Sequence, residues 1–270
     1  MQYREILYEV SEKIATITMN RPDRLNAWTK VMEGEVLDAI TAAGKDREVQ
    51  VIILTGAGRG FCAGADMNEL QGLDPADIKS DSHMRPYDMN ARSDWQSRYS
   101  SFPSISKPVI AAINGPAAGI GLIHALYCDL RFAAEGAVMT TSFSRRGLIS
   151  EHGMSWMLPY LIGPSQAFDL IISARKVDAS EALRIGLVNR VFPAGRLMEE
   201  TRDYARQLID HVSPRSMAVM KRQHYTVPFQ TLSEAIMDAN HEMALAARSA
   251  DFKEGVAHFL ERRAPRFTGQ

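Results

Sequence analysis

The chain has 270 residues, of which 46% are hydrophobic and 23% charged, the composition of a folded globular protein rather than of a long disordered one. Lysine and arginine number 31 against 32 aspartate and glutamate residues, and a net charge of -1 gives no overall field for nucleic acid or an anionic membrane. The two cysteines, Cys62 and Cys128, are too few for a disulfide framework or a zinc site, and they favour a reducing, cytoplasmic location.

The first two thirds of the chain alternate strand and helix patterns. Alternating apolar and polar residues predict a hairpin over 3–10 and 13–19. Further strands are predicted over 49–56, 108–113, 128–134 and 137–141, and helices over 29–43 and 119–127. The apolar stretch Val109–Leu126 is not expected to cross a membrane, because turn residues interrupt it at Gly115-Pro116.

The last third of the chain is helical by spacing from residue 153, apart from a predicted strand over 187–192. Residues 72–101 contain Pro75 and Pro86 and are expected to form short surface helices that shape one end of a ligand pocket. The pattern therefore indicates an α/β core that is followed by a helical end.

Two segments share a design that can carry chemistry. Each places a buried strand before small residues and a helix start: VIILTGAGRGFCAGAD (51–66) and VIAAINGPAAGIG (109–121). Small residues let a ligand approach the backbone, and the N–H groups at a helix start point outward without a partner. Two such groups that converge on one oxygen would stabilise negative charge there. The alternative is a pair of tight turns between core elements.

Five motifs favour the oxyanion site over a pair of tight turns, because they resemble those of a known family. They are NRPDRLNAW (20–28), GRGFCAGADM (58–67), KPVIAAINGPAAGIG (107–121), CDLRFAAEGAVM (128–139) and EGVAHFLERRAPRF (254–267). Together they resemble the crotonase family, the enoyl-CoA hydratase/isomerase superfamily. The resemblance implies an α/β fold, a crotonase-like spiral of strand–strand–helix repeats. It further implies a core with the active site over 1–200 and a helical region over 201–270 that forms homotrimers or dimers of trimers.

The resemblance also implies an acyl-CoA thioester as the substrate, with its carbonyl oxygen held in an oxyanion hole of two main-chain N–H groups. The motifs place these groups at Ala65 and Ile120, where Ile120 replaces the usual glycine. Asp66 is expected to order the loop rather than to react. CoA is part of the substrate, so no separate cofactor and no metal is expected, and neither nucleic acid nor membrane is expected as a partner.

The two positions that carry glutamate in hydratases of this family are apolar in this chain. They fall at Ile123 and Phe143, which can neither hold nor deprotonate water and are expected to line the acyl pocket with His152. His124, the neighbour of Ile123, is expected to be a core or interface histidine with satisfied hydrogen bonds. The loss of both glutamates predicts that ordinary hydratase chemistry is absent.

Glu151 offers a replacement acid. It lies in RRGLISEHGMSWMLPYLIG (145–163) and matches the place where some isomerases of the family carry a single acidic residue. One carboxylate is enough to move a proton from C2 to C4. The alternative is a carboxylate that caps the helix start at Gly153–Met154. Apolar neighbours would raise the pKa of Glu151 and a helix N-terminus would lower it, so its direction stays open.

The resemblance places several residues along the CoA moiety. Arg24 is expected near the phosphates and the adenine, and Arg262 is expected to reach CoA from the C-terminal helices. Ala27, Ala63 and Met67 are expected to contact the pantetheine and the adenine. The alternative for each arginine is a solvated surface charge.

The sequence therefore predicts an enzyme of acyl-CoA and fatty acid metabolism that isomerises 3-enoyl-CoA to 2-enoyl-CoA through one carboxylate. A first alternative is an enoyl-CoA hydratase in which Glu151 and His152 hold water. A second alternative is an acyl-CoA-binding protein without turnover. The acyl chain length does not follow from the sequence.

Overall fold

The computed structural model describes residues 2–72 and 92–270. Its strands are β1 (Ile6–Ser11), β2 (Ile14–Met19), β3 (Val51–Gly56), β4 (Val109–Ile113), β5 (Ala117–Ala118), β6 (Leu130–Ala134), β7 (Val138–Thr140), β8 (Val177–Asp178) and β9 (Arg190–Phe192). They form a six-stranded sheet in the order β1-β2-β3-β4-β6-β9 and a three-stranded sheet in the order β5-β7-β8.

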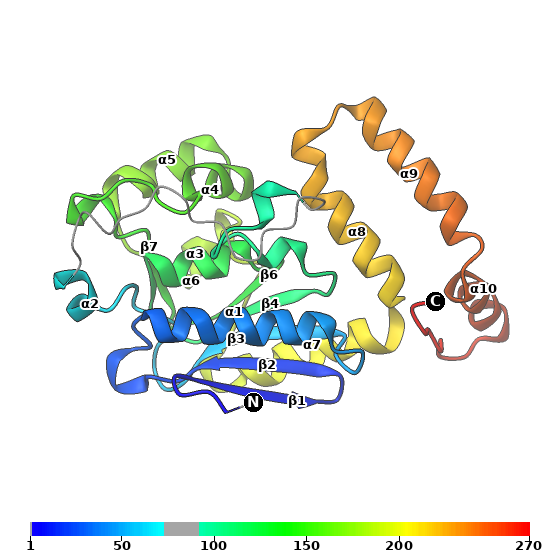
Figure 1. Cartoon of the computed structure of the whole chain (residues 1–270), viewed down its shortest axis with the longest axis horizontal. Helices are drawn as coiled ribbons and strands as arrows, with labels where there is room; N and C mark the ends of the chain where they lie inside the picture. The colour runs from blue at the N-terminus through cyan, green and yellow to red at the C-terminus, as the bar shows by residue number, and fades with distance from the viewer. Residues whose placement is uncertain (1, 73–91) are drawn as a thin grey trace.

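The helices connect and cover these sheets, and the last of them extend beyond the core (Figure 1). They are α1 (Lys30–Lys45), α2 (Met67–Gln71), α3 (Ile120–Tyr127), α4 (Met154–Ile162), α5 (Pro164–Ser173), α6 (Ala179–Arg184), α7 (Leu197–His211), α8 (Pro214–Thr226), α9 (Leu232–Ala246) and α10 (Ala250–Glu261).

The large sheet begins as a hairpin and continues as a parallel sheet. Glu12 and Lys13 join β1 to β2 with φ angles of 52° and 62°, the left-handed geometry of a type I′ turn. From β2 onward each neighbouring pair in this sheet is parallel. Parallel neighbours need a crossover connection, and α1 supplies the one between β2 and β3.

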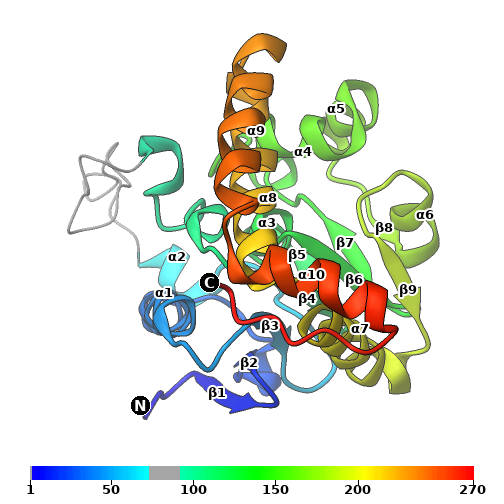
Figure 2. The ribbon, with the colours of Figure 1, turned by 90° about the vertical axis from the view of Figure 1, so that its right-hand side faces the viewer.

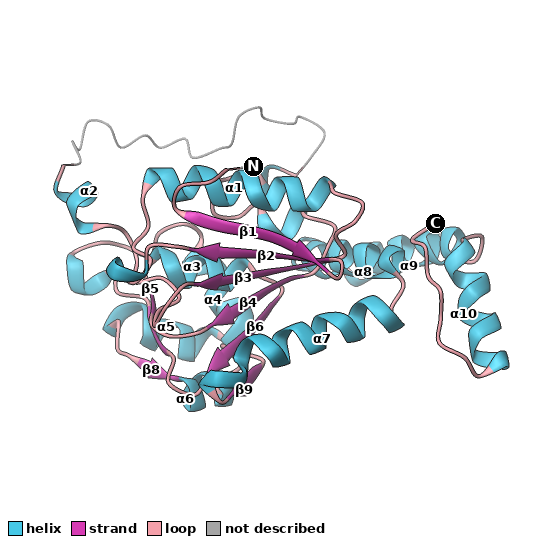
Figure 3. Ribbon diagram, turned by 90° about the horizontal axis from the view of Figure 1, so that it is seen from below, coloured by secondary structure: helices cyan, strands magenta, loops and turns pink. Residues whose placement is uncertain are grey.

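Helices cover both faces of the large sheet. Ile52 and Leu54 of β3 belong to the hydrophobic cluster that includes α1, whereas Val51 and Ile53 belong to the cluster that includes α7. Figure 3 shows α1 and α7 on opposite sides of the sheet. Because both faces are buried, the central strands read as continuous apolar runs rather than as alternating ones.

The C-terminal helices leave the core after α8. Lys221 of α8 is buried and donates to Asp129 (2.7 Å) and to the carbonyls of Phe102 (3.1 Å) and Lys107 (2.9 Å), which fixes α8 to the core. Figure 1 shows α9 and α10 extending away from the sheet, and in the end-on view of Figure 2 they lie in front of it. These two helices expose large apolar side chains, including Leu232 (78% exposed), Met237 (69%), Phe259 (77%) and Leu260 (74%).

The structure confirms the predicted α/β class with a helical C-terminal region. The predicted hairpin, the helix over 29–43 and the strands over 49–56 and 108–113 are present. The strand predicted over 187–192 begins only at Arg190, because the N–H groups of Leu187 and Val188 bond to the carbonyl of Ala182.

Three further predictions concern the surface helices, the domain boundary and membrane crossing. Most of the predicted surface helices of 72–101 fall on 73–91, which lie outside the described residues, and the remainder includes a short 3-10 helix at Ser93–Trp95. The domain boundary predicted at residue 200 falls within α7, and the division of the chain into two domains stays a prediction. In the described ranges 2–72 and 92–270, no helix combines the length and the apolar character needed to cross a membrane.

Candidate active site

A cavity of about 300 Å³ lies at the start of α3. Its walls come from four segments far apart in the sequence, namely the turn before α1, the loop into α2, the start of α3, and residues 142–151. Nine of the predicted site residues line it: Arg24, Ala27, Ala63, Ala65, Asp66, Met67, Ile120, Phe143 and Glu151.

The backbone of Ala65 faces this cavity. Trp28 donates its N–H to the carbonyl of Gly64 (2.8 Å) and accepts the N–H of Asp66 (2.8 Å), which makes an isolated parallel bridge between Trp28 and Ala65. In such a bridge the N–H and C=O of the central residue point away from the partner strand. The N–H of Ala65 has no acceptor among the described residues.

The second predicted donor is at the first position of α3. Ile120 follows Gly119, whose φ of 51° turns the chain into the helix. N–H groups in the first turn of a helix lack an intrahelical acceptor and carry the positive end of the helix dipole. The Ile120 side chain packs against the hydrophobic core and forms part of the cavity wall. The N–H groups of Ala65 and Ile120 thus have no acceptor in the described part of the chain, and their role as an oxyanion hole stays a prediction.

The carboxylate of Asp66 stabilises the loop that leads into α2. Its carboxylate accepts the N–H of Asn68 (3.0 Å) at the start of α2 and the guanidinium of Arg21 (2.9 Å). Arg21 also contacts Glu5 (3.5 Å), which ties the loop to the first strand region. The hydrogen bond from Asn68 and the guanidinium of Arg21 hold the pKa of Asp66 below its ordinary value. These contacts make Asp66 a structural anion.

Glu151 reaches the cavity from the turn before α4. Its side chain is 30% exposed and makes no capping hydrogen bond to α4, whose N-cap is Gly153. The capping alternative is therefore wrong: only the backbone carbonyl of Glu151 bonds to the helix, accepting the N–H of Met154 (3.0 Å). Burial of the carboxyl raises the pKa of Glu151 above its ordinary value.

The turn that carries Glu151 has an unusual backbone. His152 and Gly153 have φ angles of 54° and 74°, in the left-handed region that a non-glycine residue seldom adopts. The hydroxyl of Tyr127 on α3 donates to the carbonyl of His152 (2.8 Å). A Cβ at Gly153 would lie 2.4 Å from this hydroxyl, so glycine is needed for the close approach. The turn is therefore fixed to α3.

Three predicted site residues lie outside the cavity lining. Ile123 is fully buried in the core. His152 contacts a lining residue, with its Nε2 at 3.5 Å from Oε2 of Glu151. Arg262 follows α10, in the part of the chain that extends away from the core. Their predicted contacts with substrate stay predictions.

His124 differs from its prediction. The ring is buried (1% exposed), but neither Nδ1 nor Nε2 has a hydrogen-bond partner in residues 2–72 and 92–270. The prediction of satisfied hydrogen bonds is wrong because aromatic rings surround the imidazole, with Trp28 at 4.0 Å and Tyr99 and Phe102 at 5.6 Å between centroids. Burial lowers the pKa of His124 to about 3, which keeps the ring neutral.

Some residues that line the cavity were not predicted from the sequence. Arg146 and Leu148 line the same cavity as Glu151, as do Leu70 and Ser142. The signal that could have found Arg146 is its place in the segment of Glu151, since a turn that brings one side chain to a cavity also brings its neighbours. Among the described residues, no three histidine, cysteine, aspartate or glutamate side chains gather as a metal ion would require.

Comparison with known proteins gives consistent matches. Residues 9–270 match a family model described as enoyl-CoA hydratase/isomerase. The 1,2-epoxyphenylacetyl-CoA isomerase of Escherichia coli (strain K12) is 34% identical over 98% of this chain and 98% of its own. A probable enoyl-CoA hydratase of Rhodobacter capsulatus is 34% identical over 100% of both chains.

Solved structures of enoyl-CoA hydratases are also similar to this chain over nearly its whole length. The crystal structure of an enoyl-CoA hydratase from Bacillus anthracis has a TM-score of 0.87 and 27% identity, covering 99% of this chain and 100% of that one. That of an enoyl-CoA hydratase from Mycobacterium tuberculosis H37Rv has a TM-score of 0.86 and 27% identity, covering 98% and 99%.

Proposed function

Because this chain belongs to the enoyl-CoA hydratase/isomerase family, we propose that it moves the double bond of a 3-enoyl-CoA to give the 2-enoyl-CoA. The observation that carries the proposal is the state of Glu151. Within the described chain, two acidic residues line the cavity, Asp66 and Glu151. Arg21 and the N–H of Asn68 hold Asp66, which leaves Glu151 as the acidic group free to exchange protons.

The proposed reaction is a proton transfer with no net change in atoms. The thioester oxygen accepts hydrogen bonds from the N–H groups of Ala65 and Ile120. The Glu151 carboxylate removes a proton from C2, and the C–H electron pair forms a dienolate whose negative charge lies on the thioester oxygen. The Glu151 carboxyl then returns the proton at C4, and the double bond lies between C2 and C3. A positioned acid–base group contributes about 10²–10⁴ in rate, and each oxyanion donor about 10²–10³.

The environment of Glu151 suits a group that both takes and gives a proton. Burial raises its pKa, so the carboxyl holds the abstracted proton more firmly than an exposed glutamate would. Phe143 in the cavity wall and Ile123 in the core are apolar and provide no second acid or base. One carboxylate is enough for a proton shift within a molecule, whereas hydration also requires a held and activated water.

The remaining lining residues support an acyl-CoA substrate. Arg24 lies at the cavity, where its cation can pair with CoA phosphates, and Ala27, Ala63 and Met67 form a wall for the pantetheine. CoA enters as part of the substrate, and no separate cofactor is proposed. Arg262 would contact CoA from a C-terminal helix.

The test compares Glu151→Gln and Glu151→Asp with the wild type on a 3-enoyl-CoA. We expect Glu151→Gln to lower kcat by about 10²–10⁴ because the amide cannot take the proton. Glu151→Asp should retain more activity, because it keeps the carboxyl. Glu135→Gln, in an exposed turn, is the matched control. Turnover by Glu151→Gln within a few fold of wild type would overturn the assignment, and binding without turnover in the wild type would favour the acyl-CoA-binding alternative.

A second candidate is hydration of a 2-enoyl-CoA. It is favoured by the pairing of His152 Nε2 with Glu151 Oε2 at 3.5 Å, which presents two polar groups to a water molecule, and by relatives that are named as hydratases. Loss of the conjugated-thioester absorbance of a 2-enoyl-CoA, with 3-hydroxyacyl-CoA as the product, would support this reaction over isomerisation.

We also propose that the chain assembles into a homotrimer or a dimer of trimers through its C-terminal helices. The exposed apolar side chains of α9 and α10, among them Leu232 and Phe259, support the assembly, because large contiguous apolar surfaces on a monomer mark interaction sites. Sedimentation equilibrium should give three or six times the 30.0 kDa chain mass. A cytoplasmic location stays a prediction from the sequence.

A further inference from the structure

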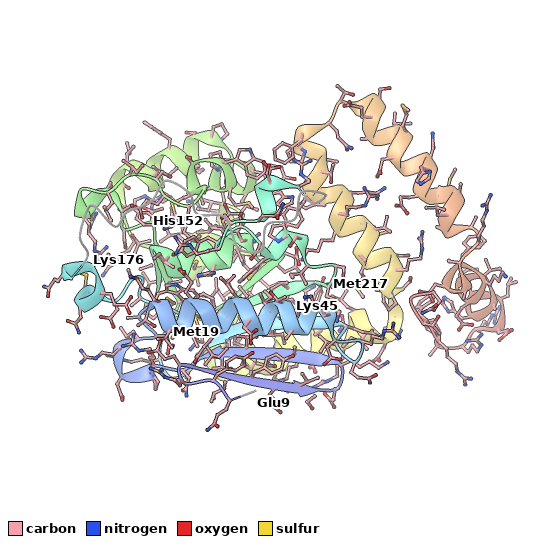
Figure 4. The ribbon with its side chains drawn as sticks, in the orientation of Figure 1. Glu9, Met19, Lys45, His152, Lys176 and Met217 are labelled. Atoms are coloured by element: carbon pink, nitrogen blue, oxygen red, sulfur yellow. The ribbon has the colours of Figure 1, made fainter. Side chains whose placement is uncertain are left out.

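A contact with α3 holds the turn that carries Glu151 in a fixed backbone conformation. His152 adopts a left-handed φ of 54°, a conformation that persists in a non-glycine residue only where its surroundings fix it. The fixing contact is the Tyr127 hydroxyl, which donates to the His152 carbonyl at 2.8 Å. Figure 4 shows His152 between α3 and the helices α4 and α5.

The His152 ring is also fixed. Its centroid lies 4.0 Å from that of Tyr99, at an interplanar angle of 41°. Tyr99 is itself held, because its hydroxyl donates to Glu33 Oε2 (2.6 Å) on α1, while Arg98 pairs with Glu33 Oε1 (3.0 Å). An anchored tyrosine therefore supports one face of the imidazole and leaves its Nε2 edge toward Glu151.

We infer that His152 is a positioning residue for Glu151: its Nε2–H holds Oε2 and leaves Oε1 as the oxygen that exchanges protons with the substrate. The 3.5 Å separation is longer than an ordinary hydrogen bond. Catalytic hydrogen bonds are often long in unliganded sites and shorten when substrate binds, and the inference requires the same of this contact. This inference rests on the proposed role of Glu151.

The imidazole is suited to holding rather than to transferring a proton. Burial lowers the pKa of His152 to about 4, so the ring is neutral near pH 7 and can offer one N–H. The charged and titratable groups around it are Glu151 in its own turn, Arg98 and Tyr99 from the segment after residue 92, Glu33 from α1 and His124 from α3.

Three variants distinguish a positioning role of His152 from a role in packing alone. His152→Phe keeps a ring against Tyr99 and removes the N–H. His152→Asn restores a donor, and asparagine tolerates a left-handed φ. His211→Phe, at the exposed end of α7, is the matched control. Thermal unfolding and circular dichroism establish that each variant is folded.

With a 3-enoyl-CoA, we expect His152→Phe to lower kcat by about 10- to 100-fold, the value of a hydrogen bond to a charged group, with KM unchanged. Losing a donor to the carboxylate disfavours its charged form, so the acid limb of the kcat profile moves up by about one pH unit. His152→Asn should recover most of the rate. The inference is overturned if His152→Phe keeps the wild-type rate and profile, or if His152→Asn is as impaired as His152→Phe.

A second measurement needs no turnover and so separates this inference from the proposed function. The Glu151 carboxyl is titrated by infrared difference spectroscopy of ¹³C-glutamate-labelled protein against Glu151→Gln. A rise in the Glu151 pKa in His152→Phe supports the contact even if the wild type does not isomerise 3-enoyl-CoA. An unchanged Glu151 pKa refutes it even if Glu151→Gln is inactive.

Discussion

Replacing Ile120 with proline would remove one N–H group from the cavity and leave the rest of α3 in place. Ile120 is the first residue of α3, the position where proline is best tolerated because its missing N–H has no intrahelical acceptor. The preceding residue is Gly119, whose lack of a Cβ and ψ of −120° keep it clear of the clash that proline imposes on most predecessors. No described residue accepts the Ile120 N–H, so no hydrogen bond within the protein is lost.

The expected effect is on the chemical step. One backbone donor to a developing oxyanion contributes about 10²–10³ in kcat, or about 2.7–4 kcal/mol of transition-state stabilisation. Ile120→Pro should therefore lose about that factor with a 3-enoyl-CoA. The control is Ile120→Ala, which removes the side chain from the cavity wall but keeps the N–H, and which should change KM more than kcat.

Two measurements are needed together. Steady-state kinetics gives kcat and KM, and thermal unfolding shows that Ile120→Pro is folded. The reasoning is refuted if a folded Ile120→Pro turns over at the rate of Ile120→Ala, since the N–H of Ile120 would then not bind the charge that forms during the reaction.

Two further predictions concern stability. Lys221→Met should lower the free energy of unfolding by about 3–5 kcal/mol in urea, because Asp129 keeps a largely buried charge without its partner, whereas the exposed control Lys253→Met should change little. For Asp66, a folded pKa below the ordinary value means that its contribution is present above the unfolded pKa and is lost as pH falls through the folded pKa. The stability difference between wild type and Asp66→Asn should accordingly shrink as urea titrations move from about pH 7 to pH 3, and a constant difference would contradict the assignment.

The elements that could be predicted from the sequence are those with a local signal. The strands β3 and β4 are largely apolar runs that lead into glycine-containing turns, and α1 begins where Thr29 accepts the N–H of Met32. The two-residue strands β5 and β8 could not be predicted, because two residues show no periodicity and exist as strands only through pairing with β7.

Some features of the candidate site could likewise be predicted from the sequence, and others could not. Ordered motifs predicted Ala65 and Ile120, and a matching family position within residues 145–163 predicted Glu151. All three residues line one cavity. The contact between Tyr127 and the His152 carbonyl could not be predicted, because it joins α3 to a turn 25 residues away through a backbone shape that side-chain patterns do not encode. The direction of the Glu151 pKa shift also required the fold, since it depends on how much of the carboxyl is desolvated.

The groups of this cavity come from independent parts of the chain. Ala65 belongs to a bridge beside Trp28, Ile120 opens a helix, and Glu151 sits on a turn that a tyrosine hydroxyl ties down. In the proposed reaction, main-chain N–H groups would bind the substrate carbonyl, while one replaceable side chain would determine which reaction follows. If the proposal holds, such a scaffold would acquire new chemistry by exchanging an acid at a single turn or wall position, while the backbone that binds the thioester stays the same.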